Sequence, residues 1–382
     1  MREDWDIRLF KDVFDLQMGK TPDRKNFSLF EGDNTWVSIK DLDGKYISKS
    51  KECISDEAAK NIKLVKRGTV IMSFKLTVGK TAIAAKDLYT NEAIMAFNLR
   101  CGYDIDASFL YYYLMNYRWE GSNKAVMGIT LNKATISKHK IAIPPKSTQL
   151  SIVSELDKLN ELIRIKKEQL KDYDALAQSI FYEMFGDPVE NEKGWEVKKL
   201  KDISRKIGDG LHGTPEYSES DTGWYFINGN NLENGCISIK STTKKVTDSV
   251  RKKYYVEMDD FTLLVSINGT LGKSAFYNGE NVILGKSACY IKLNKDVNKL
   301  FIYEIIRGEY FKLYAESVCT GTTIRNVSLK AMREFPIIYP PLSLQHSFTQ
   351  KIEQIEQQKA AIQKTITDLE TLLAARMQYW FD

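Results

Sequence analysis

The sequence is a tandem repeat, and this feature limits the possible folds more than any other. Four segments recur in the same order: DWDIRLFKDVF as GWEVKKLKDIS, WVSIKDLDGKYISKS as WYFINGNNLENGCISIKS, VIMSFKLTVGKTAIA as LLVSINGTLGKSAFY, and GITLNKATISKHKIAIPP as GTTIRNVSLKAMREFPIIYPP. The offset stays between 188 and 196 residues, as expected for one domain duplicated with small loop insertions. Two similar domains are therefore predicted.

Each repeat has the pattern of a mixed domain with strands and one helix. Runs rich in Val, Ile, Tyr and Phe predict strands at 35–40, 69–74, 81–85 and 93–99 in the first half. DASFLYYYLMNYRW predicts a helix that begins after an Asp106 cap, and VNKLFIYEIIRGEYFKLY is its partner in the second half. The predicted fold class is α+β, with two repeated α/β domains.

A long amphipathic helix follows the Pro-Pro pair of each repeat. Its apolar positions step by four and three from Ile152 to Met184 and again from Phe348 to Trp380, with Lys166 and Lys359 inside the apolar seam. A helix of ~36 residues is about 54 Å long, too long to lie inside a domain of this size. The two helices are expected to form an antiparallel coiled coil with a pseudo-two-fold relation between the halves. The predicted boundaries are 1–148 and 188–344 for the domains, and 149–187 and 345–382 for the helices.

Two Gly-Lys-Thr/Ser sequences, TVGKTA at 77–82 and TLGKSA at 270–275, resemble the end of a phosphate-binding loop. Such a loop needs a glycine five positions before the Gly-Lys pair, and Phe74 and Ile267 stand there instead. We therefore do not expect an ATP site, and a nucleotide hydrolase that rests on these two sequences stays only as an alternative function. Both sequences are predicted to be the same turn between strands in the two repeats, with Lys80 and Lys273 placed to touch phosphate.

Composition excludes several classes of protein. The 43% hydrophobic and 27% charged residues are ordinary for a globular chain, and no apolar run is long enough for a membrane span. Five cysteines without a Cys-x-x-Cys pair and only three histidines give no metal-ligand pattern. The charged start MREDWDIRLF lacks a secretory apolar core, so a cytoplasmic location is expected.

In this order of features the chain resembles the specificity subunits of type I restriction-modification systems. The resemblance covers nearly all 382 residues: two domains that each open near a tryptophan, the turns GKTP and DGLHGTPEY, and a Pro-Pro pair followed by Gln149 or Gln345 and a long helix. It implies a DNA-binding subunit without catalysis, in which each target-recognition domain recognises one part of a split, asymmetric DNA site. It also implies helices that set the spacing and dock two adenine methyltransferase subunits, which restriction and translocase subunits join. S-adenosylmethionine, ATP and Mg²⁺ are then expected on those partners, and this chain itself is expected to bind no cofactor.

Loop residues that can pair with base edges are the candidate DNA contacts, because Arg, Lys and Asn side chains match guanine and adenine in the major groove. Beside Lys80 and Lys273, the candidates in the first domain are Lys75, Asn132 and Lys133. Those in the second domain are His212, Asn228, Asn230, Asn268 and Arg325.

Two alternative functions stay open from the sequence. DPVENEK after the first long helix offers carboxylates and a lysine, as a nuclease site would, but it lies in a predicted linker without a strand to arrange them. A coiled-coil scaffold without a DNA role would explain the helices alone.

Overall fold

The computed structural model describes residues 5–119, 123–125, 128–319 and 325–382. The chain divides into two compact units: unit 1 comprises residues 1–168 and 363–382, and unit 2 comprises residues 169–362. Each unit therefore holds one sequence repeat, the first part of the long helix that follows it, and the last part of the other long helix. Mixed strands and helices in both units confirm the predicted α+β class.

The centre of unit 1 is a five-stranded sheet with a smaller sheet beside it. The larger sheet has the order β2-β9-β6-β7-β4, and the smaller has the order β5-β3-β8. Strands predicted from the sequence are present near the expected places. Their bounds are Phe14–Met18 (β2), Asn34–Val37 (β3), Tyr46–Ile47 (β4), Glu52–Ile54 (β5), Val70–Ser73 (β6), Thr81–Ala84 (β7), Tyr89–Thr90 (β8) and Ile94–Leu99 (β9).

Unit 2 has two four-stranded sheets, of order β14-β23-β20-β21 and β15-β19-β16-β22. The pairing β6-β7 in unit 1 corresponds to β20-β21 in unit 2, and the parallel pair β3-β8 corresponds to β16-β22. The bounds are Ser204–Gly208 (β14), Tyr217–Ser218 (β15), Tyr225–Ile227 (β16), Lys245–Val246 (β19), Thr262–Ser266 (β20), Ser274–Phe276 (β21), Val282–Leu284 (β22) and Ala288–Leu293 (β23).

Smaller elements complete both units. Each repeat closes on an antiparallel pair that joins its start to its end: β1-β12 in unit 1 and β13-β24 in unit 2. These and the remaining short elements are Asp6–Leu9 (β1), Asn123–Ala125 (β10), Gly128–Thr130 (β11), Lys140–Ile143 (β12), Val197–Lys199 (β13), Leu232–Glu233 (β17), Cys236–Ile237 (β18), Pro336–Ile338 (β24), Phe10–Val13 (α1), Asp56–Ala59 (α2), Lys133–Lys138 (α4), Asp248–Tyr254 (α6) and Leu329–Glu334 (α9).

The helix predicted in each repeat forms the core together with the sheet. In unit 1, α3 (Ala107–Asn116) begins at the Asp106 cap, whose side chain accepts from the backbone N–H groups of Ser108 and Phe109, as expected. Phe109 and Leu114 are buried against the sheet. In unit 2 the prediction of one helix is wrong: α7 (Lys299–Arg307) stops at Gly308, and α8 (Glu309–Val318) follows. Gly308 takes an extended backbone there, so α8 turns Phe311 and Ala315 into the core.

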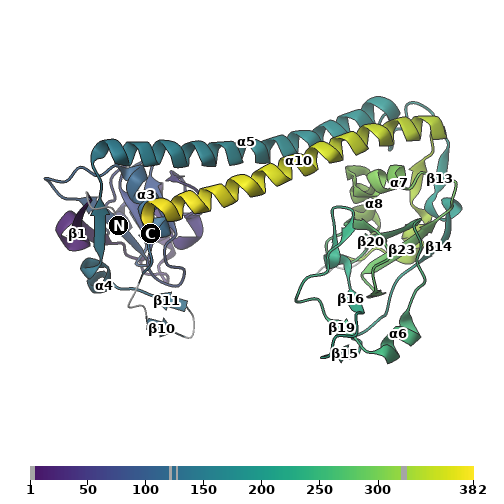
Figure 1. Cartoon of the computed structure of the whole chain (residues 1–382), viewed down its shortest axis with the longest axis horizontal. Coiled ribbons are helices and arrows are strands. Elements are labelled where there is room, and N and C mark those ends of the chain that lie inside the picture. The colour runs from purple at the N-terminus through teal and green to yellow at the C-terminus, as the bar shows by residue number, and fades with distance from the viewer. Residues whose placement is uncertain (1–4, 120–122, 126–127, 320–324) are drawn as a thin grey trace. The chain divides into compact units, whose positions relative to one another are not determined.

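The two long helices are α5 (Lys146–Phe185) and α10 (Leu342–Phe381). In unit 1, Lys167 Nζ pairs with Glu370 at 2.7 Å, and Arg376 Nη2 donates to Glu155 at 3.1 Å. Residue numbers therefore rise along α5 in the direction in which they fall along α10, which confirms an antiparallel pair (Figure 1). In unit 2 the pairing runs the same way, with Lys359 Nζ 2.8 Å from Asp174 and the Phe181 and Phe348 rings 5.7 Å apart.

The predicted apolar seam of these helices is partly buried, since its apolar members are either buried or half-buried. The buried members include Ile152, Leu156 and Ile163 on α5, and Ile352 and Ile366 on α10. Where the first helix ends, Gly186 adopts a positive φ of 75° and its N–H donates to Tyr182 O, so a glycine caps the helix.

Candidate nucleic-acid interface

The Gly-Lys-Thr sequence of unit 1 forms a hairpin between β6 and β7. Ser73 N–H donates to Lys80 O at 2.8 Å, and Gly79 N–H donates to Ser73 O at 3.0 Å. Gly79 has a φ of 92°, a conformation that favours glycine. The Lys80 N–H bonds to Ser73 Oγ at 3.1 Å. The backbone N–H groups of Gly79 and Lys80, which would face phosphate in a nucleotide site, are therefore used within the hairpin.

The Gly-Lys-Ser sequence of unit 2 makes the same hairpin between β20 and β21. Ser266 N–H donates to Lys273 O at 2.7 Å, and Gly272 N–H donates to Ser266 O at 3.0 Å. The residues that replace the missing glycine, Phe74 and Ile267, are 1% and 3% exposed and belong to the two cores. The sequence-based prediction of one turn used twice is thus supported by equivalent hydrogen bonds.

A second loop lies against each hairpin. In unit 1, Leu131 N–H donates to Phe74 O at 2.9 Å; in unit 2, Val327 N–H donates to Ile267 O at 2.8 Å. These bonds bring the hairpin residues Lys75 and Lys80 close to the loop that carries Asn132 and Lys133. Lys80, Asn132 and Lys133 are exposed and Lys75 is half-buried. Asn132 also caps α4, because its Oδ1 accepts from Thr135 N at 2.8 Å.

The corresponding candidates of unit 2 also meet. Gly269 N–H donates to Arg325 O at 3.0 Å, and Asn268 forms an isolated antiparallel bridge with Asn326. Arg325 is exposed, and its guanidinium pairs with Glu316 of α8 at 2.7 Å.

Ser287 connects the remaining candidates of unit 2 to the hairpin. Its Oγ donates to Asn228 Oδ1 at 2.9 Å and accepts from Gly229 N at 3.0 Å, while its carbonyl accepts from Ile267 N at 3.1 Å. Gly285 leaves no room for a side chain, because a Cβ there would lie 2.2 Å from Asn228 Oδ1. Asn228 is half-buried and bonded within the loop, whereas Asn230 is exposed.

His212 lies at the edge of this loop cluster. Leu211 N–H donates to Leu284 O at 2.7 Å, and Lys286 N–H donates to Leu211 O at 3.0 Å. The exposed His212 ring approaches Asp209 at 2.7 Å between Nε2 and Oδ2. The predicted residues of unit 2 therefore lie on loops, or in the case of Asn230 on a short 3-10 helix (Gly229–Asn231), that hydrogen bonds join to one another.

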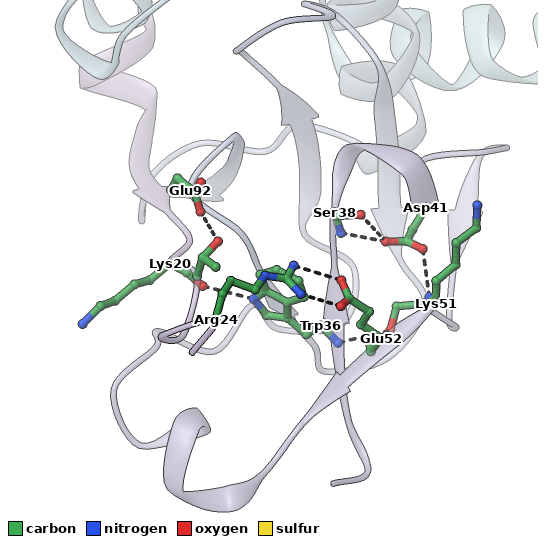
Figure 2. A network of polar contacts seen from close by, with 10 residues as sticks. Lys20, Arg24, Trp36, Ser38, Asp41, Lys51, Glu52 and Glu92 are labelled. Carbon is green, nitrogen blue, oxygen red and sulfur yellow. Dashed lines mark hydrogen bonds and ion pairs between the residues drawn. The ribbon is translucent and has the colours of Figure 1, made fainter. Parts of the chain in front are cut away.

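Sequence reasoning missed a polar network that holds the early turn of unit 1 (Figure 2). Arg24 Nη2 donates to Glu52 at 3.0 Å, and its guanidinium lies 4.5 Å from the Phe30 ring centre and 5.1 Å from the Trp36 ring centre. Hydrogen bonding to Arg24 lowers the pKa of the Glu52 carboxyl. The only sequence signal was the basic residue shortly after GKTP, which does not name its partner 28 residues away.

Two further bonds fix this turn. The buried Trp36 donates from Nε1 to Lys20 O at 3.1 Å, and Thr21 donates to Glu92 on the segment after β8 (Figure 2). Glu92 is next to Ala93, whose carbonyl accepts from Phe74 N at 3.0 Å at the start of the β6-β7 hairpin. The GKTP turn is therefore connected to the hairpin that carries Lys75 and Lys80.

Within the described ranges, no group of three or more His, Cys, Asp or Glu side chains is placed to hold a metal ion. No helix in the described part of the chain has the length and apolar character of a membrane span.

Two duplicated α/β units, each with linked polar loops and a share of two antiparallel long helices, define a two-domain recognition protein. The chain belongs to the family of type I restriction modification DNA specificity domains, because the family model matches residues 2–172 and again residues 192–371. The recognition made from the sequence is confirmed.

Individual relatives agree with this assignment. The chain is 28% identical over 225 residues to the type I restriction enzyme MjaIX specificity subunit of Methanocaldococcus jannaschii, a match to 53% of this chain and 52% of that protein. The matched region thus spans about half the length of the curated relative.

Solved structures share the fold. The S subunit of a type I restriction-modification system from M. genitalium is similar with a TM-score of 0.52 and 16% identity, over 99% of this chain and 96% of that one. A structure from work on complex assembly and conformational transition of the type I R-M system has a TM-score of 0.66 and 17% identity, over 100% and 98% of the two chains.

Proposed function

We propose that this chain is the DNA-binding specificity subunit of a type I restriction-modification complex, in which each unit recognises one part of a bipartite, asymmetric site. The observation that carries this proposal is that each unit has the same cluster of loops, made of the Gly-Lys hairpin and the second loop that bonds to it. Their hairpins have the same backbone bonds, but the side chains differ: Lys75, Asn132 and Lys133 in unit 1, against Asn268 and Arg325 in unit 2. A common frame with different polar side chains suits recognition of two different sequences.

The chemistry of these loops fits a DNA duplex. Arginine and lysine can pair with guanine, and asparagine can pair with adenine, from the major groove. Lys80 and Lys273 stand at the ends of the hairpins, where an ammonium group can contact phosphate without distinguishing bases. The N–H groups of Gly79, Lys80 and Gly272 bond within the hairpins, so this geometry gives no support to a nucleotide hydrolase.

The partners follow from the same proposal. The long helices carry exposed apolar residues, Leu162 and Ile165 in unit 1 and Leu176 in unit 2, which would suit docking of two adenine methyltransferase subunits. Restriction and translocase subunits would join this complex in the cytoplasm. The chain itself would perform no catalysis, and S-adenosylmethionine, ATP and Mg²⁺ would bind to the partner subunits.

Co-expression of the chain with a methyltransferase subunit of its own genome tests the function. We expect methylated adenines at a split, asymmetric motif, one in each part and on opposite strands, when the host DNA is sequenced for modified bases. The same methyltransferase without this chain is the control. A soluble complex that adds no new methylation would contradict the proposal and favour a scaffold without a DNA role.

Arg325→Ala should change one part of that motif only. Loss of a bidentate contact costs about 1–3 kcal/mol of discrimination at one base pair, so that position should become degenerate. Lys75→Ala in unit 1 is the matched variant and should affect the other part. If Arg325→Ala alters both parts, or neither, the assignment of this side chain to base recognition is wrong.

A further inference from the structure

A short helix at the same place in both units carries opposite charge. In unit 1, α2 begins after a Ser55 cap that accepts from Ala58 N at 3.4 Å; in unit 2, α6 begins after a Thr247 cap that accepts from Val250 N at 3.4 Å. Both helices follow the small-sheet strand that precedes the cap, β5 or β19, and both bury an apolar side chain at Ala58 or Val250. They are therefore the same element of the repeat.

The charge difference extends through the surrounding segment. Residues 240–257 of unit 2 contain six basic and two acidic residues, a net charge of +4. The equivalent residues 48–65 of unit 1 contain four basic and three acidic residues, a net charge of +1. The helices themselves differ in the same sense: α2 has Asp56 and Glu57 and is capped by Lys60, whereas α6 has Asp248 together with Arg251, Lys252 and Lys253.

Packing fixes α6 and leaves part of its charge free. Val250 lies in an apolar cluster with Phe226, Val246 and Ile283, and the Arg251 guanidinium sits 5.4 Å from the Trp224 ring centre. Lys244, Lys252 and Lys253 are exposed, and among the described residues none of the three has a carboxylate partner. The Lys253 ammonium group lies 5.2 Å from the Tyr254 ring centre. The three exposed lysines therefore add positive charge to the surface of α6 and of the loop before it.

The position of α6 relates this charge to the candidate recognition loops. The sheet β15-β19-β16-β22 supports α6, which lies beside β15 and β19 in Figure 1. Strand β16 leads directly into Asn228, and β22 leads into Gly285. Leu211, one residue before His212, packs against the same apolar cluster as Val250. The basic helix is thus part of the same structure that carries the predicted DNA contacts of unit 2.

We propose that α6 and the loop before it, with Lys244, Lys252 and Lys253, bind the phosphate backbone of the DNA duplex, and that unit 1 has no such contact at α2. This inference rests on the proposed function. Consecutive helical residues point about 100° apart, so Lys252 and Lys253 can reach different phosphates. Because phosphate contacts are independent of sequence, unit 2 would supply more of the non-specific affinity and of its salt dependence.

The test is the salt dependence of DNA binding by the full chain in complex with its methyltransferase. The double variant Lys252→Gln, Lys253→Gln should reduce the slope of log K against log salt concentration by about 2, since each phosphate contact contributes about 0.9. Between 50 and 200 mM salt, the loss of affinity should shrink by roughly tenfold. Affinity for specific and random duplexes should fall alike.

The matched control is Lys60→Gln, Lys63→Gln, which removes two exposed lysines at the end of α2 and should leave the slope unchanged. An unchanged slope in the α6 variant, or an equal change in both variants, would overturn the inference. So would a loss confined to the specific duplex, or a loss of complex assembly with normal DNA binding, which would mark α6 as a protein interface. If the unaltered complex binds no DNA at all, the proposed function fails instead.

Discussion

Phe185→Ala should lower the free energy of unfolding of unit 2 by about 3–5 kcal/mol, the usual cost of removing a buried phenylalanine ring. Phe185 is 0% exposed at the end of α5, and its ring centre lies 5.1 Å from Phe301 and 5.3 Å from Phe348. These rings come from α5, α7 and α10, so the cavity would weaken the attachment of both long helices to the unit 2 domain. Hydrogen exchange monitored peptide by peptide measures the loss in each unit.

Tyr182→Ala on the same helix is the control. Tyr182 is 38% exposed, so its loss should cost less than about 1 kcal/mol. Phe381→Ala tests the equivalent position in unit 1, where the ring is half-buried and packs 5.8 Å from Phe109. Its effect should be intermediate and confined to unit 1. Equal protection of unit 2 peptides in Phe185→Ala and Tyr182→Ala would contradict this account of the core.

Periodicity made the helices and strands predictable. The heptad spacing of Ile152, Leu156 and Ile163 identified the buried seam because a long helix has only one way to bury such a stripe. Asp106 identified a helix start because its carboxylate can satisfy free N–H groups. The break at Gly308 was not predicted, because one glycine inside an apolar pattern costs a helix only about 1 kcal/mol. Tertiary packing of α8 outweighs so small a preference and decides that two helices form.

The candidate site was predictable in part. The Gly-Lys-Thr and Gly-Lys-Ser turns marked both hairpins, since the repeat required the same turn twice. The bond from Arg24 to Glu52 could not be predicted. The register of β3 and β5 places Glu52 beside Trp36, on which Arg24 stacks, and the sequence does not give this register. The charge contrast between α2 and α6 was visible in the sequence, but only the shared caps show that they are one element.

Glu304 in unit 2 has a buried carboxyl that the sequence does not predict. Glu304 of α7 occupies the place of Tyr112 in α3, and its side chain is 7% exposed. Arg307 Nε lies 3.4 Å from one carboxylate oxygen, while the other, Oε1, has no hydrogen-bond partner in the described structure. Arg307 is shared with Glu356, at 3.4 Å. Burial raises the pKa of Glu304 to about 7, and Arg307 offsets only part of that rise.

The other charges around Glu304 come from both long helices. Lys359 of α10 pairs with Asp174 of α5 at 2.8 Å and with Glu356 at 2.9 Å, and Arg307 also approaches Asp174 at 3.8 Å. The carboxylates of this cluster are Glu304, Glu356 and Asp174, and its cations are Arg307 and Lys359. When Glu304 is ionised, three negative charges face two positive ones. When Glu304 is protonated, the charges balance. The protonated form is therefore favoured by the packing of α7 against the helices.

Glu304 should make unit 2 less stable as the pH rises. Its pKa in the folded chain is above its ordinary value of 4.5, so the folded state binds more protons between about pH 4.5 and 7. Protonated Glu304 contributes its full stability to the folded chain below that window. This contribution to the free energy of unfolding is lost as the pH rises through the window, by about 2–3 kcal/mol between pH 5 and 8. Glu304→Gln keeps the shape without the titration and should be more stable than the unaltered chain at pH 8, by a similar amount.

Urea denaturation at pH 5 and pH 8, with exchange protection of unit 2 peptides as the local readout, measures this difference. Glu309→Gln is the matched control, because Glu309 is an exposed carboxylate on α8 and its loss leaves the Glu304 cluster intact. A Glu304→Gln variant with the same pH dependence as the unaltered chain would show that this carboxyl does not titrate between pH 5 and 8. In that case Arg307 and Lys359 would hold Glu304 ionised, and the cluster would be a permanent clamp between α7 and the long helices.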